Sequence, residues 1–256
     1  MLRLEALSVM LGGRRILHDL DLTLAAGQLT SIVGPSGSGK STLLRAITGE
    51  IPYRGSALLN GQEVARMAPA QLARARAVLP QDTQVSFAFT VAEVVAMGGF
   101  QGPPAAPHRI EELLETVGLG GKGGRLVQSL SGGERQRVHL ARVLLQAGAP
   151  IGPEGPRWLF LDEPVSSLDI AHQLSVMRIA RAFADQGGAV VAVMHDLNLA
   201  AMFSDQIAVL AAGRIIAQGR PEAVITAEMI TTVYGCKIGV CEAPLKGPWL
   251  LVQTAQ

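Results

Sequence analysis

The chain has 256 residues, and its 22 lysine and arginine residues against 21 aspartate and glutamate residues leave a net charge of +1 at pH 7. A chain of this length can bury a sizeable core, but its charge gives no electrostatic argument for a nucleic-acid partner. No apolar run approaches the roughly 18 to 20 residues of a membrane-spanning helix. Arg3 and Glu5 interrupt the first apolar run, where a signal peptide is uncharged, so we expect a cytoplasmic protein. Cys236 and Cys241 lack metal-ligand spacing, which predicts reduced structural thiols.

The N-terminal part of the chain has the pattern of β-structure. Residues 1–30 alternate in the manner of short strands, with turn signals at Gly12-Gly13 and Ala26-Gly27. An apolar run then leads into a glycine-rich loop, and residues 40–48 have the pattern of the helix that leaves it.

Helical patterns dominate residues 90–145, with no convincing strand between them. The stretch Ala147–Arg157 contains three prolines and three glycines, and it predicts an irregular surface loop. The apolar runs in RWLFLDEP, AVVAVMHD and DQIAVLAAGRIIA predict buried strands, and the tail from Gly235 is β-like. Strands and helices interleaved in this way predict an α/β fold with parallel strands at its centre.

A phosphate-binding loop is predicted by GPSGSGKS, which fits G-x-x-x-x-G-K-[ST] and follows an apolar run. Glycines in such a loop let successive backbone N–H groups point at phosphate oxygens. Lys40 would supply a charge to the β- and γ-phosphates, and Ser41 a hydroxyl to Mg²⁺. A chance match does not explain the strand before the loop and the helix after it. The predicted nucleotide-binding residues are Gly34, Pro35, Ser36, Gly37, Ser38, Gly39, Lys40, Ser41 and Thr42.

Two carboxylates, Asp162 and Glu163, stand at the end of the apolar run in WLFLDEP. A buried strand would deliver both to its carboxyl end, where ligands bind in doubly wound sheets. We predict that Asp162 holds Mg²⁺, directly or through water, and that Glu163 polarises the attacking water. The alternative is a pair of solvated acids ahead of the turn residue Pro164.

The segment LSGGE places Ser131, Gly132, Gly133 and Glu134 at the start of a predicted helix. A hydroxyl and free backbone N–H groups there make an anion site that needs no lysine. Because the chain already has one phosphate cradle, a second makes sense if it closes over a nucleotide held by another copy of the chain. The alternative is a capping box, which would explain the serine and the glutamate but not the two glycines.

These three motifs, in this order, resemble the ATP-binding cassette family over about Leu2–Gly219. The resemblance implies a P-loop NTPase fold with a central parallel sheet, an N-terminal antiparallel β subdomain and a helical subdomain. It further implies one ATP-binding domain over residues 1–256. In that domain a catalytic lobe takes up about residues 1–85 and 155–256, and a helical lobe about residues 86–154.

The resemblance also implies roles for single residues. His195 would contact the γ-phosphate and orient the water and Glu163. Gln81 would reach Mg²⁺ and the water from the hinge between the lobes. Asp169 would cross the interface of a head-to-tail, two-fold homodimer that encloses two ATP molecules.

Two positions depart from the family pattern. Leu11 stands where many members stack an aromatic residue on adenine, which leaves the preference for ATP over GTP open. Val165 stands where threonine is common, and we expect little effect from it.

Longer segments, among them FAFTVAEVVAMG and HDLNLAAMFSDQIAVLAAGRIIAQG, resemble the bacterial haem (hemin) importer ATPases. This implies an ATPase subunit on the cytoplasmic face of the inner membrane, with two transmembrane permease subunits and an indirect periplasmic substrate-binding protein. Permease helices would dock near residues 81–97, where the apolar residues of 86–98 would serve as docking surface, as core of the lobe, or as both.

Other functions remain open at this point. Ferric-siderophore or cobalamin import is the alternative within the same family. A soluble cassette ATPase acting in DNA repair or translation is an alternative of a different class, disfavoured by the near-zero net charge. A small-molecule phosphotransferase would share the phosphate loop but would leave LSGGE and His195 unexplained.

Overall fold

The structure is a computed structural model that describes residues 1–81, 87–99 and 105–242, and its larger sheet has six strands. Their spatial order is β12 (Arg214–Gly219), β11 (Gln206–Ala211), β3 (Leu29–Val33), β10 (Ala189–Val193), β9 (Trp158–Asp162) and β6 (Arg76–Leu79). All neighbouring pairs are parallel except β11 with β12. The predicted α/β fold with a central parallel sheet is confirmed.

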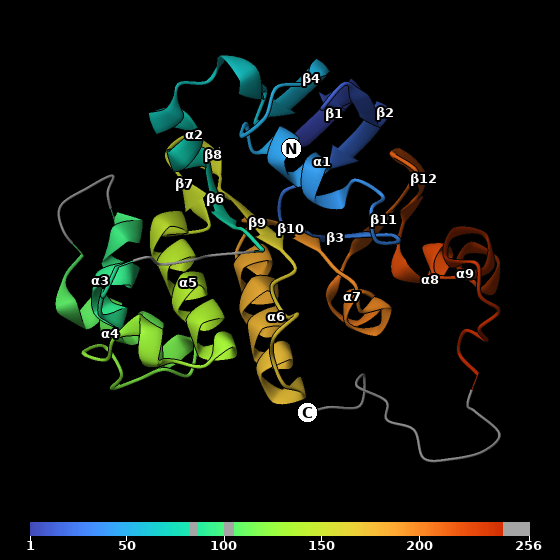
Figure 1. Cartoon of the computed structure of the whole chain (residues 1–256). Coiled ribbons are helices and arrows are strands. Elements are labelled where there is room, and N and C mark those ends of the chain that lie inside the picture. Colours follow the sequence, from blue (N-terminus) through green and yellow to red (C-terminus); the bar gives the residue numbers. More distant parts are fainter. Residues whose placement is uncertain (82–86, 100–104, 243–256) are drawn as a thin grey trace.

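A second, antiparallel sheet packs against one face of the first (Figure 1). Its strands, in spatial order, are β2 (Arg14–Leu24), β1 (Leu2–Leu11), β4 (Arg54–Leu59) and β5 (Gln62–Glu63). We predicted short strands over residues 1–30, but β1 and β2 have 10 and 11 residues. Register shifts between Leu4 and Leu7 and between Leu7 and Val9 explain the difference, because a bulge interrupts the alternation of side chains without ending the strand.

Helices cover both faces of the larger sheet (Figure 1). They are α1 (Lys40–Ile47), α2 (Pro69–Ala75), α3 (Val91–Ala96), α4 (Pro107–Thr116), α5 (Gly132–Ala147), α6 (Ile170–Asp185), α7 (Leu197–Phe203), α8 (Pro221–Val224) and α9 (Ala227–Tyr234), with 3₁₀ turns at Val64–Arg66, Met97–Gly99 and Val127–Ser129. The helices predicted over 90–145 are α3, α4 and α5, and between residues 90 and 145 the described residues form no strand, only an isolated bridge between Thr90 and Leu126.

The central strands are apolar throughout because both faces are covered. On β9, Trp158 and Phe160 face the core shared with α1 and the antiparallel sheet. Leu159 and Leu161 face the core shared with α5, α6 and α7. Two cores on opposite faces hold the strand ends in fixed positions.

The glycine- and proline-rich stretch Ala147–Arg157 is not the irregular loop that we predicted. It contains a hairpin, β7 (Ile151–Gly152) paired antiparallel with β8 (Gly155–Pro156). Gly155 adopts a φ of 108°, which a glycine permits, and a proline is tolerated in so short a ladder because few of its N–H positions are needed for pairing.

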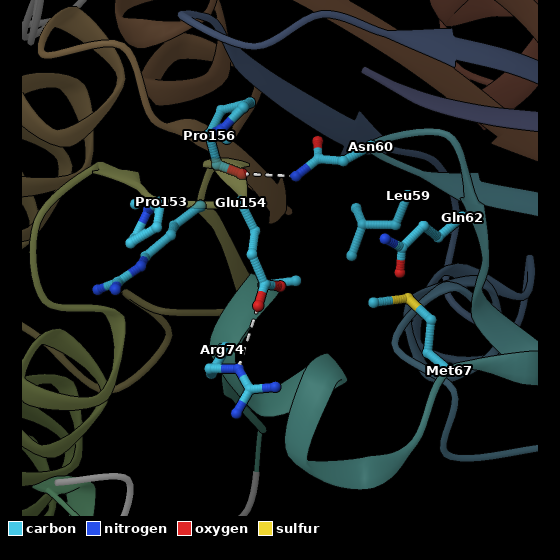
Figure 2. A pocket seen from close by; sticks show the side chains of 12 residues that line it. Leu59, Asn60, Gln62, Met67, Arg74, Pro153, Glu154 and Pro156 are labelled. Carbon is cyan, nitrogen blue, oxygen red and sulfur yellow. Dashed lines mark hydrogen bonds and ion pairs between the residues drawn. The ribbon is translucent and has the colours of Figure 1, made fainter.

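The hairpin is anchored to the rest of the protein beside a pocket, which Figure 2 shows from close by. Asn60 Nδ2 donates to Pro156 O at 2.8 Å. Arg74 and Glu154, which both line the pocket, form an ion pair at 3.4 Å (Figure 2). The other half of the pocket comes from Met67 and from the turn between β4 and β5.

The described part of the C-terminal tail differs from the β-like prediction. Gly235 ends α9 in the left-handed conformation, with a φ of 73°, and Cys236–Glu242 form no strand. The rest of the predicted β-like tail, residues 243–256, lies outside the described residues. Cys236 and Cys241 are free thiols as predicted, but both are exposed rather than packed.

His139 on α5 is buried, with 4% of its surface exposed, and neither ring nitrogen has a hydrogen-bond partner among the described residues. Burial, and then the charge of Arg142, lower the pKa of His139 from 6.5 to about 4.

This histidine gives the protein a predicted acid sensitivity. Because the folded-state pKa is below the unfolded-state value, the unfolded chain binds the proton more tightly. We expect the contribution of His139 to the free energy of unfolding to be constant above pH 6.5 and to fall as the pH drops from about 6.5 toward about 4. In His139→Leu this part of the fall should vanish in urea melts, whereas the exposed His108→Leu should follow the parent. A parental curve for His139→Leu would contradict the assignment.

Candidate functional site

Four of the predicted site features follow four neighbouring strands of the larger sheet (Figure 1). The phosphate loop follows β3, and His195 comes two residues after β10. Glu163 follows β9 directly, and Gln81 comes two residues after β6. Because these strands are parallel neighbours, their carboxyl ends gather the four features at one edge of the sheet.

Glycines make the phosphate loop possible at three positions. Gly34, Gly37 and Gly39 have φ values of 152°, 75° and 103°. A Cβ atom on Gly34 would lie 1.9 Å from the Leu210 carbonyl oxygen, and one on Gly39 would lie 2.8 Å from Leu17 Cδ2. The backbone conformation favours glycine at all three positions, and the surrounding atoms also leave no room for a side chain at Gly34 and Gly39.

The loop leads directly into α1, with Gly39 as N-cap and no side-chain cap. The first N–H groups of a helix have no partner within it, and here they come directly after the glycine-rich loop. Of the remaining predicted loop residues, Ser36 is exposed, Ser38 is buried, and Pro35, Ser41 and Thr42 are half-buried. The buried Ser38 Oγ has no hydrogen-bond partner within the described part of the chain. A hydroxyl without a protein partner, beside the uncapped start of a helix, fits the phosphate oxygens of a nucleotide.

Lys40 is buried, with 6% of its surface exposed. Its Nζ donates to the carbonyl oxygens of Gly34 at 2.8 Å and Pro35 at 2.9 Å. Burial lowers the pKa of the Lys40 ammonium, and the nearby carboxylates of Glu163 and Asp162 oppose this shift. The ammonium therefore lies at the loop and within the electrostatic reach of both acids.

Asp162 faces the phosphate loop across a short gap. Ser41 Oγ donates to Asp162 Oδ1 at 3.2 Å, so the two predicted metal ligands lie side by side. Burial raises the pKa of the Asp162 carboxyl, against the effects of the Ser41 hydrogen bond and the Lys40 charge. Among the described residues no group of three or more His, Cys, Asp or Glu side chains is placed to hold a metal ion. A cation here would need further oxygen ligands, which fits Mg²⁺ bound together with nucleotide phosphates and water.

Gln81, Glu163 and His195 form one contact group. Gln81 Nε2 donates to Glu163 Oε2 at 2.9 Å, and His195 Nε2 lies 2.5 Å from Glu163 Oε1. The Glu163 side chain is 14% exposed and that of His195 is 46% exposed. The alternative of two solvated acids at a strand end is wrong, since Asp162 is buried and both oxygens of Glu163 are engaged.

The LSGGE segment forms the start of α5, with Ser131 as N-cap. The capping box that we considered is present: Glu134 N donates to Ser131 Oγ at 3.2 Å, and Ser131 N donates to Glu134 Oε2 at 2.9 Å. Lys122 Nζ donates to the second oxygen of Glu134 at 2.5 Å, and mainly this bond lowers the pKa of Glu134 to about 2.

The two glycines of this segment are not equally explained by packing. A Cβ on Gly133 would lie 3.0 Å from Leu168 Cδ2 and 3.1 Å from Ser167 O. Gly132 has nothing within 4 Å of such an atom, so no packing within the chain requires it. An approaching ligand or partner remains an explanation for Gly132, because a glycine lets another group come close to the helix start.

Asp169 caps α6, the helix after the acidic strand. It accepts a hydrogen bond from His172 N at 2.9 Å, and mainly this bond lowers the pKa of Asp169. Its side chain is 67% exposed, so it is accessible to a partner. Leu11 ends β1 and is 36% exposed, and Val165 is buried in the core.

Gln136 on α5 was not among our predicted site residues, yet its Nε2 donates to the Glu163 carbonyl oxygen at 3.1 Å. The sequence gives only a weak signal for this role, because Gln136 is one of several polar residues in the same helix and nothing in the pattern distinguishes it from the others. The contact joins residues 27 positions apart, which only the folded chain shows.

The pocket in Figure 2 is separate from this site, since none of its lining residues belongs to the predicted set. The helices within residues 1–81, 87–99 and 105–242 are all too short or too polar to cross a bilayer.

Comparisons with known proteins identify the family. Residues 17–166 match the model of the ABC transporter family. The chain is 52% identical to the Hemin import ATP-binding protein HmuV of Rhizobium meliloti (strain 1021), over 100% of this chain and 99% of that protein. It is also 52% identical to the protein of the same name from Jannaschia sp. (strain CCS1), over 95% of this chain and 91% of that one.

Solved structures agree. A bacterial Atm1-family ABC exporter with ATP bound superposes with a TM-score of 0.77 at 28% identity, covering 88% of this chain and 39% of the exporter. An ATP-binding cassette in a dimeric post-hydrolysis state bound to ADP and Pi gives a TM-score of 0.75 at 25% identity, covering 86% and 99%. The chain therefore belongs to the ABC transporter family, as our sequence analysis predicted.

Proposed function

We propose that this chain is the ATP-hydrolysing subunit of a membrane importer for hemin. The observation that carries the proposal is the contact of Gln81, Glu163 and His195 beside the phosphate loop, in a chain half identical to proteins named for hemin import. The contact of the three side chains supports hydrolysis, and the sequence identity supports hemin as the cargo.

ATP binds by its phosphates at the loop Gly34–Ser41. The loop amides and the start of α1 receive the phosphate oxygens, and Lys40 turns its ammonium from the Gly34 and Pro35 carbonyls toward the β- and γ-phosphates. Leu11, which is exposed at the end of β1, offers the base an apolar contact that distinguishes adenine weakly from guanine.

Ser41 and Asp162 hold Mg²⁺, with Gln81 as a further ligand from the end of β6. The ion neutralises charge on the transferred phosphoryl group when it is bound. Asp162 must be ionised for this role, and because burial raises its pKa, we expect magnesium-dependent binding to weaken at a higher pH than for an exposed aspartate.

Glu163 acts as the base that polarises the attacking water. Its two carboxylate oxygens are held by Gln81 and His195, so the lone pairs that face the phosphates have a defined direction. His195, whose side chain is half exposed beside Glu163, also contacts the γ-phosphate. A water between the carboxylate and the γ-phosphate is then oriented by groups that come from three different strands.

Two copies of the chain assemble head to tail, so that Ser131, Gly132 and the start of α5 of one copy close over the nucleotide of the other. Asp169, which is exposed at the cap of α6, lies at this interface. The dimeric post-hydrolysis cassette supports such an assembly, because its fold covers 86% of this chain.

The dimer binds two transmembrane permease subunits at the cytoplasmic face of the inner membrane, and a periplasmic substrate-binding protein delivers the cargo. Phe87, 72% exposed, and Met97, 45% exposed, supply apolar surface for a permease helix around α3. Val91, Val94 and Val95 of the same segment are buried, which supports the expectation that it serves as docking surface and core together. Residues 82–86 of this docking segment lie outside the described residues.

The other candidate functions have less support. The curated relatives described above are named for hemin import, which favours hemin over a ferric siderophore or cobalamin. A soluble cassette ATPase in DNA repair or translation, or a small-molecule phosphotransferase, has no matching observation in the site. A nucleic-acid partner is not expected for a chain with a net charge of +1.

The test is transport in proteoliposomes that contain the permease and this chain, supplied with hemin, a ferric siderophore or cobalamin. We expect hemin to accumulate only with MgATP and only with the chain present. Accumulation of another cargo instead of hemin would correct the substrate. Hydrolysis without any transport, or a phosphorylated small molecule as product, would overturn the importer role.

A further inference from the structure

The backbone of Glu163 is held in an unusual conformation. Its φ is 51°, in the left-handed region that residues other than glycine rarely adopt. Such a conformation persists only where the surroundings hold it. Here the Glu163 N–H donates to Val193 O at 3.2 Å, and the Glu163 carbonyl accepts from Gln136 Nε2 at 3.1 Å and from Ser166 Oγ at 3.2 Å.

These contacts come from different parts of the fold. Val193 belongs to β10, and Ser166 lies in the turn that follows Glu163 itself. Gln136 alone reaches in from α5, five residues after the N-cap Ser131. Ser166 holds the Glu163 carbonyl from within the local turn, through Oγ and through N–H at 3.4 Å, and the bond from Gln136 ties the same carbonyl to a helix outside that turn.

A second contact joins the same two segments. Gly133, also in the first turns of α5, packs against the Ser167 carbonyl and the Leu168 side chain so closely that a Cβ atom would lie 3.0 Å from Leu168 Cδ2. With Gln136 bound to the Glu163 carbonyl, the start of α5 and residues 163–168 touch at two places. The distance between them cannot change without breaking one of these contacts.

We propose that Gln136 is a positioning residue for hydrolysis: it fixes the Glu163 carbonyl and thereby the direction of the Glu163 carboxylate. The inference rests on the proposed role of Glu163 as the base. Within the described residues, the side-chain hydrogen bond of Gln136 goes to the Glu163 carbonyl and to none of the predicted nucleotide-binding or metal-binding residues. Gln136 also lies on α5, whose start we propose closes over the nucleotide of the partner copy. One helix therefore carries both the donor to Glu163 in its own site and the segment that completes the partner's site.

The test compares Gln136→Met, which keeps the length of the side chain and removes the donor, with Gln173→Met as matched control. Gln173 Nε2 donates to Val165 O at 3.3 Å, so it makes the same kind of bond to the same turn but not to Glu163. For Gln136→Met we expect kcat to fall about tenfold, because a small misalignment of a reacting group is costly. The Kd for MgATP should stay within about twofold, since no phosphate contact is lost. Gln173→Met should keep the parental kcat.

A donor-bearing variant separates positioning from general packing. Gln136→Lys restores an N–H donor on an unbranched side chain, and we expect it to recover most of the lost kcat. Melting temperatures show whether each variant is folded. An unchanged kcat in folded Gln136→Met would overturn the inference, as would equal losses in Gln173→Met or in Gln136→Lys. If the parent chain itself hydrolyses no ATP, the proposed function fails instead, so the two failures are distinguishable.

Discussion

Glu163→Gln is expected to reduce ATP hydrolysis by about a hundredfold to a thousandfold while leaving ATP binding intact. An amide has the shape of the carboxylate and cannot accept the proton of the attacking water. The substitution removes no hydrogen bond with the phosphate loop, because the Lys40 ammonium donates to loop carbonyls and not to Glu163. Hydrolysis is measured as phosphate release, and binding by calorimetry with MgATP.

The same variant is expected to accumulate as an ATP-bound dimer. Once hydrolysis is blocked, the nucleotide that joins the two copies persists, and light scattering should show conversion from monomer to dimer on addition of MgATP. The control is Glu154→Gln, which changes an exposed carboxylate in the hairpin, outside the predicted site, and should behave as the parent. If Glu163→Gln loses hydrolysis but stays monomeric with MgATP, either the permease is needed to hold the dimer or the LSGGE segment does not complete a partner's site.

Lys40→Met is expected to weaken MgATP binding on the order of a hundredfold, since a charged hydrogen bond contributes about 3 kcal/mol and each factor of ten corresponds to about 1.4 kcal/mol. Arg45→Met is the matched control, because Arg45 lies on the same helix with 53% of its side chain exposed. Calorimetry with MgATP measures both, and equal affinities for the parent and Lys40→Met would contradict the role of Lys40.

Without nucleotide, Lys40→Met is expected to be at least as stable as the parent. Burial lowers the pKa of Lys40 in the folded state below its usual 10.5, so the unfolded chain binds this proton more tightly. The ionised lysine therefore costs stability at neutral pH, a cost that diminishes as the pH rises toward 10.5. Methionine removes the buried charge, and urea melts of the apo protein at pH 7 should show an unchanged or higher free energy of unfolding. A large loss would mean that the two carbonyl contacts outweigh the burial of the charge.

Local patterns in the sequence were sufficient for the elements that carry the motifs. The glycines of the phosphate loop could be recognised because their left-handed backbone admits few other residues. Apolar runs such as Trp158–Leu161 mark central strands, because a strand covered on both faces has no polar side. The capping pair Ser131 and Glu134 marks the start of α5 for the same kind of local reason.

Several features could not be read in that way. The hairpin at residues 151–156 is anchored by Asn60, 96 positions away from Pro156, and its own residues suggest an irregular loop. The unpaired burial of His139 depends on which face of α5 turns inward.

By itself, the sequence determined the phosphate loop, the acidic strand end and the capped helix, because each needs particular residues at short spacing to satisfy its own backbone and charges. Tertiary structure decided the strand order that puts Gln81, Glu163 and His195 in contact, and the bond from Gln136 that holds the left-handed turn of Glu163. Those arrangements join residues 27 to 82 positions apart. They depend on how crossovers order the strands and how helices pack on the sheet, and neither can be predicted from a short run of residues.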